Sequence, residues 1–238
     1  MYKVLIAQAR FGSSRLPGKV LYPIAGRPML AHVIDRLRAV RRADLVVVAT
    51  SYNPVDDIVA DWAKVLETQV FRGSEEDVLS RYVAASKHYK ADLVVRVCCD
   101  APLIDPVVID RAIEQYLEHR DSVDYVSNMM TRTFPRGQSV EVIRPLVLEE
   151  LDIRAADPHQ REHVTPYLLE NPTHFRVSEY LNSIDLSGMN WTVDTRDDLL
   201  FVREVYNRLY KPGKIFGMSD VLRLLEANPE LAAKGSIK

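Results

Sequence analysis

Apolar residues fall along the first half of the chain in two alternating patterns. Short continuous apolar runs predict buried strands, at residues 4–9, 44–50, 69–71 and 93–98. Between these runs, apolar residues recur at helical spacing and predict amphipathic helices, at residues 29–40, 55–66 and 78–83. Strands that alternate with helices are typical of βαβ units. We therefore expect an α/β fold with a mostly parallel sheet that is covered by helices on both faces.

The pattern becomes less regular in the second half of the chain. A further helix and two further strands are expected, at residues 108–117, 124–127 and 139–143. The alternation is lost from about Met129 onward. Asp157 and Thr165 each precede a proline, which predicts two helix starts. We interpret residues 132–181 as a small inserted lobe beside the sheet, carrying acceptor-substrate or dimer contacts.

The last part of the chain returns to the core. Residues 191–194 predict a short strand, and Thr195 with Asp198 resembles a capping box before a helix over 199–209. A final helix over 219–226 precedes a polar tail.

Composition limits the classes of protein to consider. The 238 residues are 47% apolar and 27% charged, which fits a single globular domain over residues 1–238. No apolar run is long enough to span a membrane and no signal peptide is recognisable, so we expect a cytoplasmic protein. A net charge of −2 without long basic clusters argues against nucleic-acid or membrane-surface partners. The two cysteines are adjacent, Cys98 and Cys99, and cannot build a disulfide framework.

Charge is distributed unevenly, because residues 1–34 contain no acid. The first strand leads into a loop with glycines that permit tight turns, serines, and cationic side chains, at Gly12, Gly18, Ser13, Ser14, Arg10, Arg15 and Lys19. Backbone N–H groups, hydroxyls and charge-assisted donors in this arrangement are suited to phosphate oxygens. The loop matches neither of the common glycine-rich phosphate motifs. It predicts a polyphosphate site, with a solvated basic turn as the alternative.

Two aspartates follow predicted strands. Asp100 comes directly after the apolar run at 93–98, and Asp194 ends the predicted strand at 191–194. Ligands of parallel sheets lie beyond the carboxyl ends of the strands, so we expect these loops to converge with the basic loop. Magnesium prefers carboxylate and phosphate oxygens, which makes the pair a candidate metal site. Alternatively, Asp100 braces its loop and Asp194 caps a helix.

Several segments resemble the sugar-acid cytidylyltransferases, and most closely the spore coat polysaccharide biosynthesis protein F group. The resemblance lies in Ala9-Arg10 with Gly12 to Lys19, in Asp-Ala-Pro-Leu-Ile-Asp-Pro at 100–106, in 161–166 and in Asn-Trp-Thr-Val-Asp-Thr at 190–195. It implies a single-domain, Rossmann-like nucleotidyltransferase fold of the GT-A-like type. It also implies that the basic loop wraps the triphosphate of CTP, that Arg10 and Lys19 neutralise it, and that Asp100 and Asp194 hold magnesium.

The resemblance suggests further site residues. It places Gly73, Asp77 and Arg81 beside the nucleotide, although Asp77 and Arg81 are spaced for an exposed helical salt bridge. Main-chain groups of Ala7 and Ala9 are candidates for reading cytosine. The expected acceptor residues are Arg136, Glu141 and His163, with a structural role as the alternative for His163.

The sequence thus predicts a magnesium-dependent cytidylyltransferase that is active in surface polysaccharide or glycoconjugate biosynthesis. It would transfer CMP from CTP to a small anionic acceptor, a sugar acid, with Arg10, Lys19 and Asp100 as the catalytic residues. The resemblance also implies a homodimer. A nucleotide-sugar-dependent glycosyltransferase of related fold and a non-catalytic nucleotide-binding protein are the alternatives. Cys98 and Cys99 stand where the group usually has threonine and glycine, which adds a side chain near the expected site.

Overall fold

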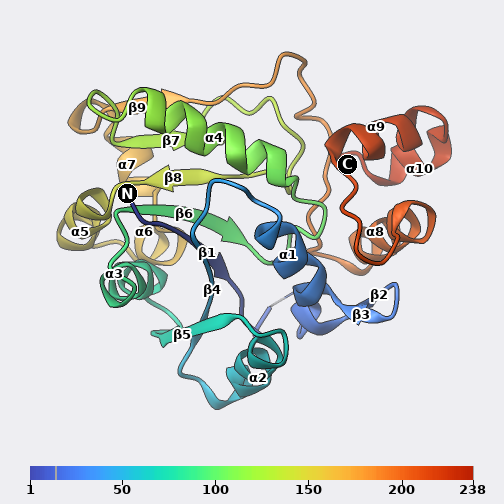
Figure 1. Cartoon of the computed structure of the whole chain (residues 1–238), viewed down its shortest axis with the longest axis horizontal. Coiled ribbons are helices and arrows are strands. Elements are labelled where there is room, and N and C mark those ends of the chain that lie inside the picture. The colour runs from blue at the N-terminus through green and yellow to red at the C-terminus, as the bar shows by residue number, and fades with distance from the viewer. Residues whose placement is uncertain (14, 238) are drawn as a thin grey trace.

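A computed structural model describes residues 1–13 and 15–237, in which seven strands form one mixed sheet. The strand order is β5-β4-β1-β6-β8-β7-β9, from the bottom to the top of Figure 1. All neighbours are parallel except at β8, which runs antiparallel to β6 and β7. The strands are β1 (Lys3–Gln8), β4 (Leu45–Ser51), β5 (Gln69–Gly73), β6 (Leu93–Cys98), β7 (Tyr125–Ser127), β8 (Glu141–Ile143) and β9 (Val177–Glu179). The predicted α/β fold with a mostly parallel sheet is confirmed.

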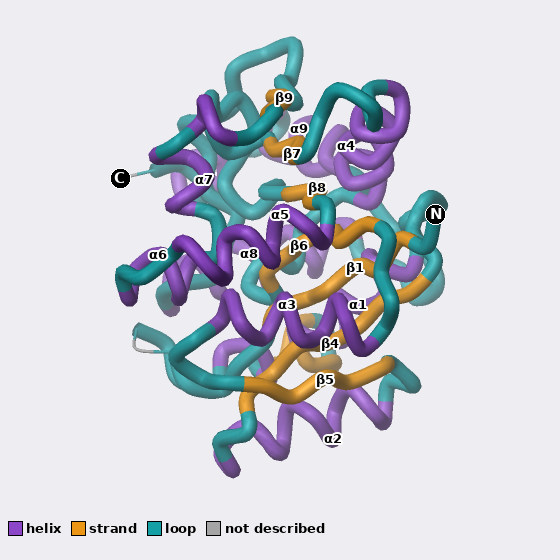
Figure 2. The backbone as a smooth tube through the Cα atoms, turned by 90° about the vertical axis from the view of Figure 1, so that its left-hand side faces the viewer, coloured by secondary structure: helices purple, strands orange, loops and turns teal. Residues whose placement is uncertain are grey.

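Helices cover both faces of this sheet. Leu5 and Ala7 of β1 join one apolar cluster with α1, α4 and α8, whereas Val4 and Ile6 join a second cluster with α3, α5 and α7. Alternate residues of a strand point to opposite faces, so β1 is buried on both sides. Figure 2 shows α3, α5 and α6 along the second face. The helices are α1 (Met29–Arg38), α2 (Asp57–Val65), α3 (Val78–His88), α4 (Pro106–Glu118), α5 (Pro145–Arg154), α6 (Pro158–His163), α7 (Pro166–Glu170), α8 (Arg196–Leu209), α9 (Met218–Glu226) and α10 (Pro229–Lys234).

Short elements complete the fold. A small hairpin pairs two antiparallel strands, β2 (Pro23–Ile24) and β3 (Arg27–Pro28). Single turns of 3₁₀-helix lie at η1 (Lys19–Leu21), η2 (Pro54–Asp56) and η3 (Pro172–His174).

The segment 132–181 lies partly inside the sheet, not beside it as expected. It supplies β8, which is placed between β6 and β7, and the edge strand β9. Its helices α5 and α6 pack against α3. A strand as short as β8 carries little periodic signal, and only its hydrogen-bonded neighbours reveal that it belongs to the sheet.

Two predictions for the last part of the chain are wrong. Residues 191–194 form no strand, although Trp191 and Val193 are buried, because this segment makes only isolated backbone contacts such as Val193 N–H to the Asp100 carbonyl at 2.8 Å. The polar tail also contains a helix, α10, which buries Leu231. By contrast, the capping box of Thr195 and Asp198 at the start of α8 is confirmed.

The carboxyl ends of the central strands meet at one edge of the sheet. Gln8, the last residue of β1, pairs with Ala49 of β4 and with Cys98 of β6. The chain leaves β1 toward β4 but leaves β6 toward the opposite half of the sheet, so strand order reverses between them. Such a switch point is where α/β sheets bind ligands. Figure 1 shows α8, α9 and α10 grouped beyond this edge.

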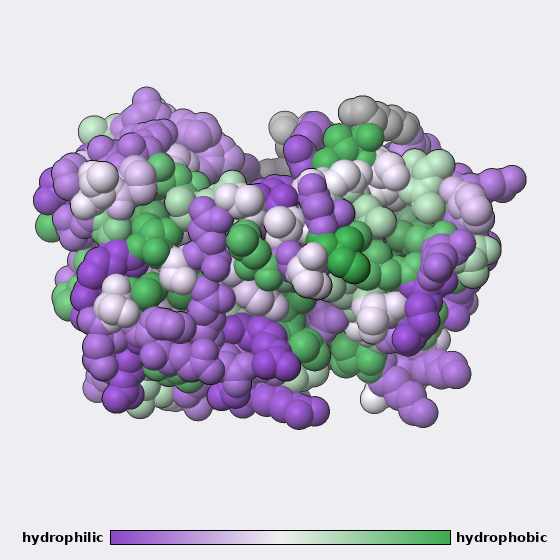
Figure 3. Space-filling model, turned by 90° about the horizontal axis from the view of Figure 1, so that it is seen from above, coloured by the Kyte–Doolittle hydropathy of each residue, from purple (hydrophilic) through white to green (hydrophobic). Residues whose placement is uncertain are grey.

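The outer surface mixes apolar and polar side chains. On the face seen in Figure 3, apolar residues are interspersed with hydrophilic ones. Within the described residues, no helix combines the length and the apolar character needed to cross a membrane.

Candidate active site

The loop after β1 has a defined backbone shape. Phe11 N–H donates to Asp56 Oδ1 at 2.6 Å, and Gly18 N–H donates to the Phe11 carbonyl at 2.8 Å. Gly18 has a φ of +72°, and a Cβ there would lie 2.9 Å from the Phe11 ring. Only glycine fits such a turn without strain. Of the loop's predicted ligands, Ser14 lies outside the described residues.

Lys19 lies at the centre of the site. Its side chain is 10% exposed, and Nζ lies 3.0 Å from Asp100 Oδ2 and 2.8 Å from Asp194 Oδ1. Burial alone would lower the pKa of Lys19, but the two carboxylates together raise it above the usual value. The ammonium group is therefore charged at neutral pH. Arg15 Nη2 adds a second cation at 2.9 Å from Asp194 Oδ1.

The two aspartates come together as the sequence predicts. Asp100 lies two residues beyond β6, and its main chain is tied to Val193. Asp194 precedes α8 but does not cap it, because Thr195 is the N-cap and bonds with Asp198. Both carboxylates are 29% exposed and line a cavity of about 260 Å³. The capping alternative for Asp194 is thus wrong.

The predicted nucleotide-binding residues fall into two groups. Ala9, Arg10, Ser13, Arg15 and Lys19 line the cavity. Ala7 and Gly12 do not contribute to its described lining: Ala7 is paired on both sides within β1.

The loop after β5 makes mainly structural contacts. Asp77 caps α3 by accepting from Ser80 N–H, and it pairs with Arg161 at 2.5 Å. The alternative interpretation, a salt bridge between Asp77 and Arg81, is therefore wrong. Arg81 is buried, and its Nη1 donates to the Ser74 carbonyl at 3.0 Å. Gly73 leaves space for the Arg81 side chain, since a Cβ at Gly73 would lie 2.8 Å from Arg81 Cγ. Nucleotide contacts of these three residues stay a prediction.

Sequence reasoning missed the acid opposite Arg10. Glu162 Oε1 of α6 accepts from Arg10 Nη2 at 3.0 Å, and Glu162 also lines the cavity. The segment 161–166 was singled out by its resemblance, but 152 positions separate the partners and no local pattern links them. An anion that binds Arg10 must compete with Glu162.

The expected acceptor residues differ in their surroundings. Arg136 is exposed and lines an adjoining cleft of about 830 Å³, which shares Arg15 and Asp194 with the central cavity. His163 is exposed at the end of α6 and lines both the central cavity and a neighbouring one of about 340 Å³. Partial burial lowers the pKa of His163, so the ring is neutral at pH 7. Its ring contacts that of His159 in a tilted arrangement, with a centroid separation of 4.5 Å.

Glu141 lines the 340 Å³ cavity but its carboxylate is already engaged. It is 2% exposed and forms an ion pair with buried Arg96. Tyr125 Oη and Thr165 Oγ1 donate to its Oε1 at 2.7 and 2.6 Å. Thr165 directly precedes α7, as predicted. Its hydroxyl donates to Glu141, however, and does not cap the helix. The contacts of Glu141 are those of a structural buried ion pair.

The two cysteines differ in burial, with Cys98 partly exposed and Cys99 buried. Cys99 is 1% exposed and packs into the apolar core, and both Cys98 and Cys99 contribute to the lining of the central cavity beside Asp100. Burial raises the pKa of Cys98 to about 11 and that of Cys99 well above its usual value. Both are thiols at neutral pH, and Cys99 is buried.

Comparisons with known sequences and structures identify proteins that are similar to this chain. A sequence model described as cytidylyltransferase matches residues 4–206. The chain is 31% identical to the spore coat polysaccharide biosynthesis protein SpsF of Bacillus subtilis, over 97% of each chain. It is 37% identical over 120 residues, about half of each chain, to an 8-amino-3,8-dideoxy-manno-octulosonate cytidylyltransferase of Shewanella frigidimarina. A solved cytidylyltransferase structure from Leptospira borgpetersenii superposes with a TM-score of 0.95 at 33% identity, covering 100% of this chain and 99% of that one.

Proposed function

The chain belongs to the cytidylyltransferase family, and from this premise we propose that it transfers CMP from CTP to a sugar acid or related acceptor, with magnesium and release of pyrophosphate. The observation that carries the proposal is the meeting of Asp100 and Asp194 on Lys19, next to the basic loop. A role in surface polysaccharide or glycoconjugate synthesis, and a homodimeric state, belong to the same proposal.

The basic loop is suited to the triphosphate. Arg10, Arg15 and Lys19 place three cations around one cavity, and Ser13 adds a hydroxyl. Charge-assisted hydrogen bonds to phosphate oxygens are stronger than neutral ones. In the described structure these cations are paired with Glu162, Asp194 and Asp100. Bound CTP would replace part of this pairing with its own anionic oxygens.

The same carboxylates fit a magnesium ion. Asp100 and Asp194 bring hard oxygen donors from two distant chain segments to one cavity wall, and each is partly open to solvent. Magnesium is commonly bound by one or two carboxylates together with phosphates and water. When bound, the ion would offset negative charge on the phosphates of CTP.

The protein's own residues would then position the reaction. An acceptor oxygen attacks the α-phosphorus while the bond from that phosphorus to the bridging β-phosphate oxygen breaks. The electron pair leaves with pyrophosphate, and the hydroxyl proton passes to solvent. Such transfers depend on alignment and on charge stabilisation. Lys19 and Arg10 would stabilise the charge that develops on the phosphates.

The proposed acceptor class is based on the names of similar proteins. The printed name of the Shewanella frigidimarina protein specifies a sugar-acid acceptor, although this chain aligns to only about half of it. The cavity of about 340 Å³ adjoins Asp100 and includes Arg96 and His163, which offers space for an acceptor next to the nucleotide.

Isothermal titration with CTP, UTP, ATP and GTP in the presence of magnesium tests the nucleotide assignment. We expect CTP to bind most tightly. Absence of CTP binding, or tighter binding of another triphosphate, would contradict the proposal. A glycosyltransferase would release a nucleotide from a nucleotide sugar, whereas this enzyme should release pyrophosphate from CTP once an acceptor is supplied.

A further inference from the structure

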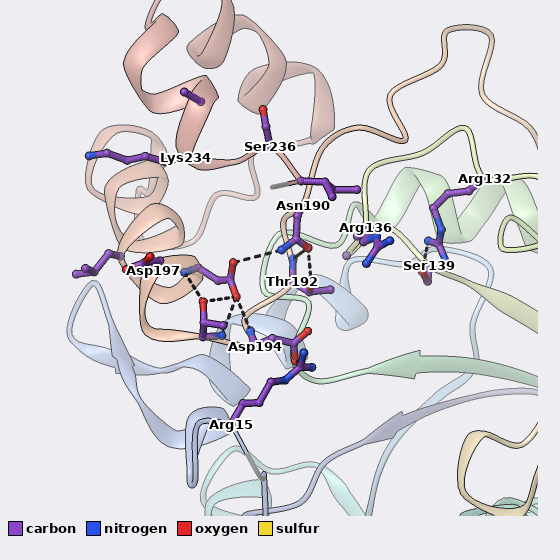
Figure 4. Close-up of a pocket in the computed structure, with 16 residues that line it drawn as sticks. Arg15, Arg132, Arg136, Ser139, Asn190, Thr192, Asp194, Asp197, Lys234 and Ser236 are labelled. Atoms are coloured by element: carbon purple, nitrogen blue, oxygen red, sulfur yellow. Dashed lines mark hydrogen bonds and ion pairs between the residues drawn. The ribbon is translucent and has the colours of Figure 1, made fainter. Parts of the chain in front are cut away.

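The cleft of about 830 Å³ continues the catalytic cavity on the side of α8. It shares Asp194 and Arg15 with that cavity, and Thr192 with the neighbouring cavity of about 340 Å³. Figure 4 shows Arg132, Arg136 and Ser139 together on one side of this cleft. The cleft therefore extends from these arginines to Asp194.

Arg132 and Arg136 form a pair of like charges. Arg132 Nη1 has one weak hydrogen bond, to Ser139 Oγ at 3.3 Å. Among the described residues, neither guanidinium has a carboxylate within ion-pair distance. Burial, followed by the repulsion from Arg136, lowers the pKa of Arg132. Two unneutralised guanidinium groups lining one cleft are suited to an anion.

The carboxylates on the opposite side of the cleft are already in use. Asp194 is bound by Lys19 and Arg15. Asp198 accepts from Thr195 and from the Asn190 side chain, and Asp197 is also engaged. These acids therefore do not neutralise the two arginines, and Figure 4 shows Asp194 and Asp197 away from them.

The backbone that presents Arg136 is rigid. Arg136 N–H donates to the Met189 carbonyl at 2.9 Å, and Trp191 N–H donates to the Arg136 carbonyl at 2.8 Å. Gly137 has a φ of +94°, and a Cβ there would lie 2.9 Å from the Trp191 carbonyl carbon. The backbone that carries Arg136 is thus held at the edge of the cleft by the fold.

We propose that Arg132 and Arg136 bind a phosphomonoester group on the acceptor, so that the enzyme acts on a phosphorylated sugar acid or a related phosphorylated acceptor. The inference rests on the proposed function and names the acceptor class within it. A phosphomonoester carries close to two negative charges at pH 7 and matches two cations, whereas a carboxylate would leave one of them unneutralised. The rest of the acceptor would lie in the adjoining cavity of about 340 Å³, which shares Gly137, Ser139 and Thr192 with the cleft.

The test uses the protein saturated with a non-hydrolysable CTP analogue and magnesium, so that the triphosphate loop is occupied. Glycerol 3-phosphate, inorganic phosphate and acetate are each titrated by calorimetry at constant ionic strength. Wild type is compared with Arg132→Gln/Arg136→Gln and with the matched exposed control Arg154→Gln. Arg136→Gln alone serves if the double variant melts early, because this side chain is exposed.

We expect glycerol 3-phosphate to bind wild type and the control, and to bind the double variant at least about tenfold more weakly. Affinity for the CTP analogue should stay within about twofold in every variant. The proposal is overturned if glycerol 3-phosphate does not bind, if acetate binds equally well, if only inorganic phosphate binds, or if the variants bind like wild type. Failure of the CTP analogue to bind wild type would instead contradict the proposed function, and the phosphate titrations without nucleotide would still report on the two arginines.

Discussion

Lys19 Nζ lies 3.0 Å from Asp100 Oδ2, although 81 positions separate the two residues in the chain. The contact joins the loop after β1 to the loop after β6, which are the two strand ends at the switch point of the sheet. The lysine also holds Asp194, so one ammonium group connects three segments of the site. The pairing keeps the basic loop and both aspartates in place before any ligand binds.

Replacement of Lys19 should weaken nucleotide binding. Lys19→Met removes a charge-assisted donor to phosphate and leaves two carboxylates without their shared cation. We expect about 10 to 100 times weaker CTP affinity by isothermal titration. Lys64→Met, at an exposed position on α2, is the control and should bind CTP like wild type. Unchanged CTP affinity in Lys19→Met would show that the loop does not bind the triphosphate in this way.

Removal of the charge on Glu162 should strengthen nucleotide binding. Glu162→Gln frees Arg10 from an ion pair in which both side chains are partly exposed, with a strength of about 0.2 to 1 kcal/mol. CTP affinity should therefore rise, by up to about fivefold, because the triphosphate no longer competes for Arg10. Glu150→Gln on α5 controls for the loss of an exposed carboxylate. Weaker CTP binding in Glu162→Gln would mean that the acid assists the nucleotide.

The contact between α3 and α6 should depend on pH. Burial alone would raise the pKa of Asp77, but hydrogen bonds from Arg161 and Ser80 lower it below the usual value. Its stabilising effect is thus present above the unfolded-state pKa of about 3.9 and lost as pH falls through the lower folded-state value. Asp77→Asn keeps a side chain that can cap α3 but loses the ion pair with Arg161. Because this pair is partly exposed, we expect the free energy of unfolding at pH 7 to fall by at most about 1 kcal/mol.

Urea unfolding of Asp77→Asn and wild type at several pH values measures this dependence. The difference in unfolding free energy should shrink as pH falls below about 4. A difference that stays constant down to pH 2 would exclude the ion pair with Arg161 as its cause.

Glu141 should matter mainly for stability. Glu141→Gln leaves the buried guanidinium of Arg96 without its counter-ion, and breaking a buried pair in this way costs about 3 to 5 kcal/mol. Denaturant unfolding should report this loss. If Glu141→Gln is as stable as wild type but impaired in transfer, the carboxylate contacts the acceptor as the sequence predicts, and our structural assignment is wrong.

The sequence was informative where periodicity is strong and the loop chemistry is local. The sheet strands and α-helices of residues 3–118, though not the hairpin of β2 and β3, follow from apolar spacing. The meeting of Asp100 with Asp194 follows from the position of both acids after buried segments. A strand at 139–143 is predicted, but the placement of β8 between β6 and β7 could not be, because the neighbours of a strand are set by tertiary packing.

Pairings between distant residues were also beyond the sequence. Arg10 with Glu162, Asp77 with Arg161 and Arg96 with Glu141 each join different elements, and their partners become visible only in the folded chain. Local spacing instead favoured Asp77 with Arg81, but Arg81 is buried under Gly73. The burial of Cys99 likewise depends on which face of the loop meets the core.

The central claim is that Asp100 belongs to a magnesium and CTP site. Thermal unfolding of wild type, Asp100→Asn and the exposed control Asp61→Asn, with CTP in the presence and absence of magnesium, tests it most directly. A ligand at about 100 times its dissociation constant adds roughly 2.7 kcal/mol, or several degrees in melting temperature. We predict a magnesium-dependent increment in wild type and the control that is lost in Asp100→Asn. An equal increment in all three proteins would contradict the account.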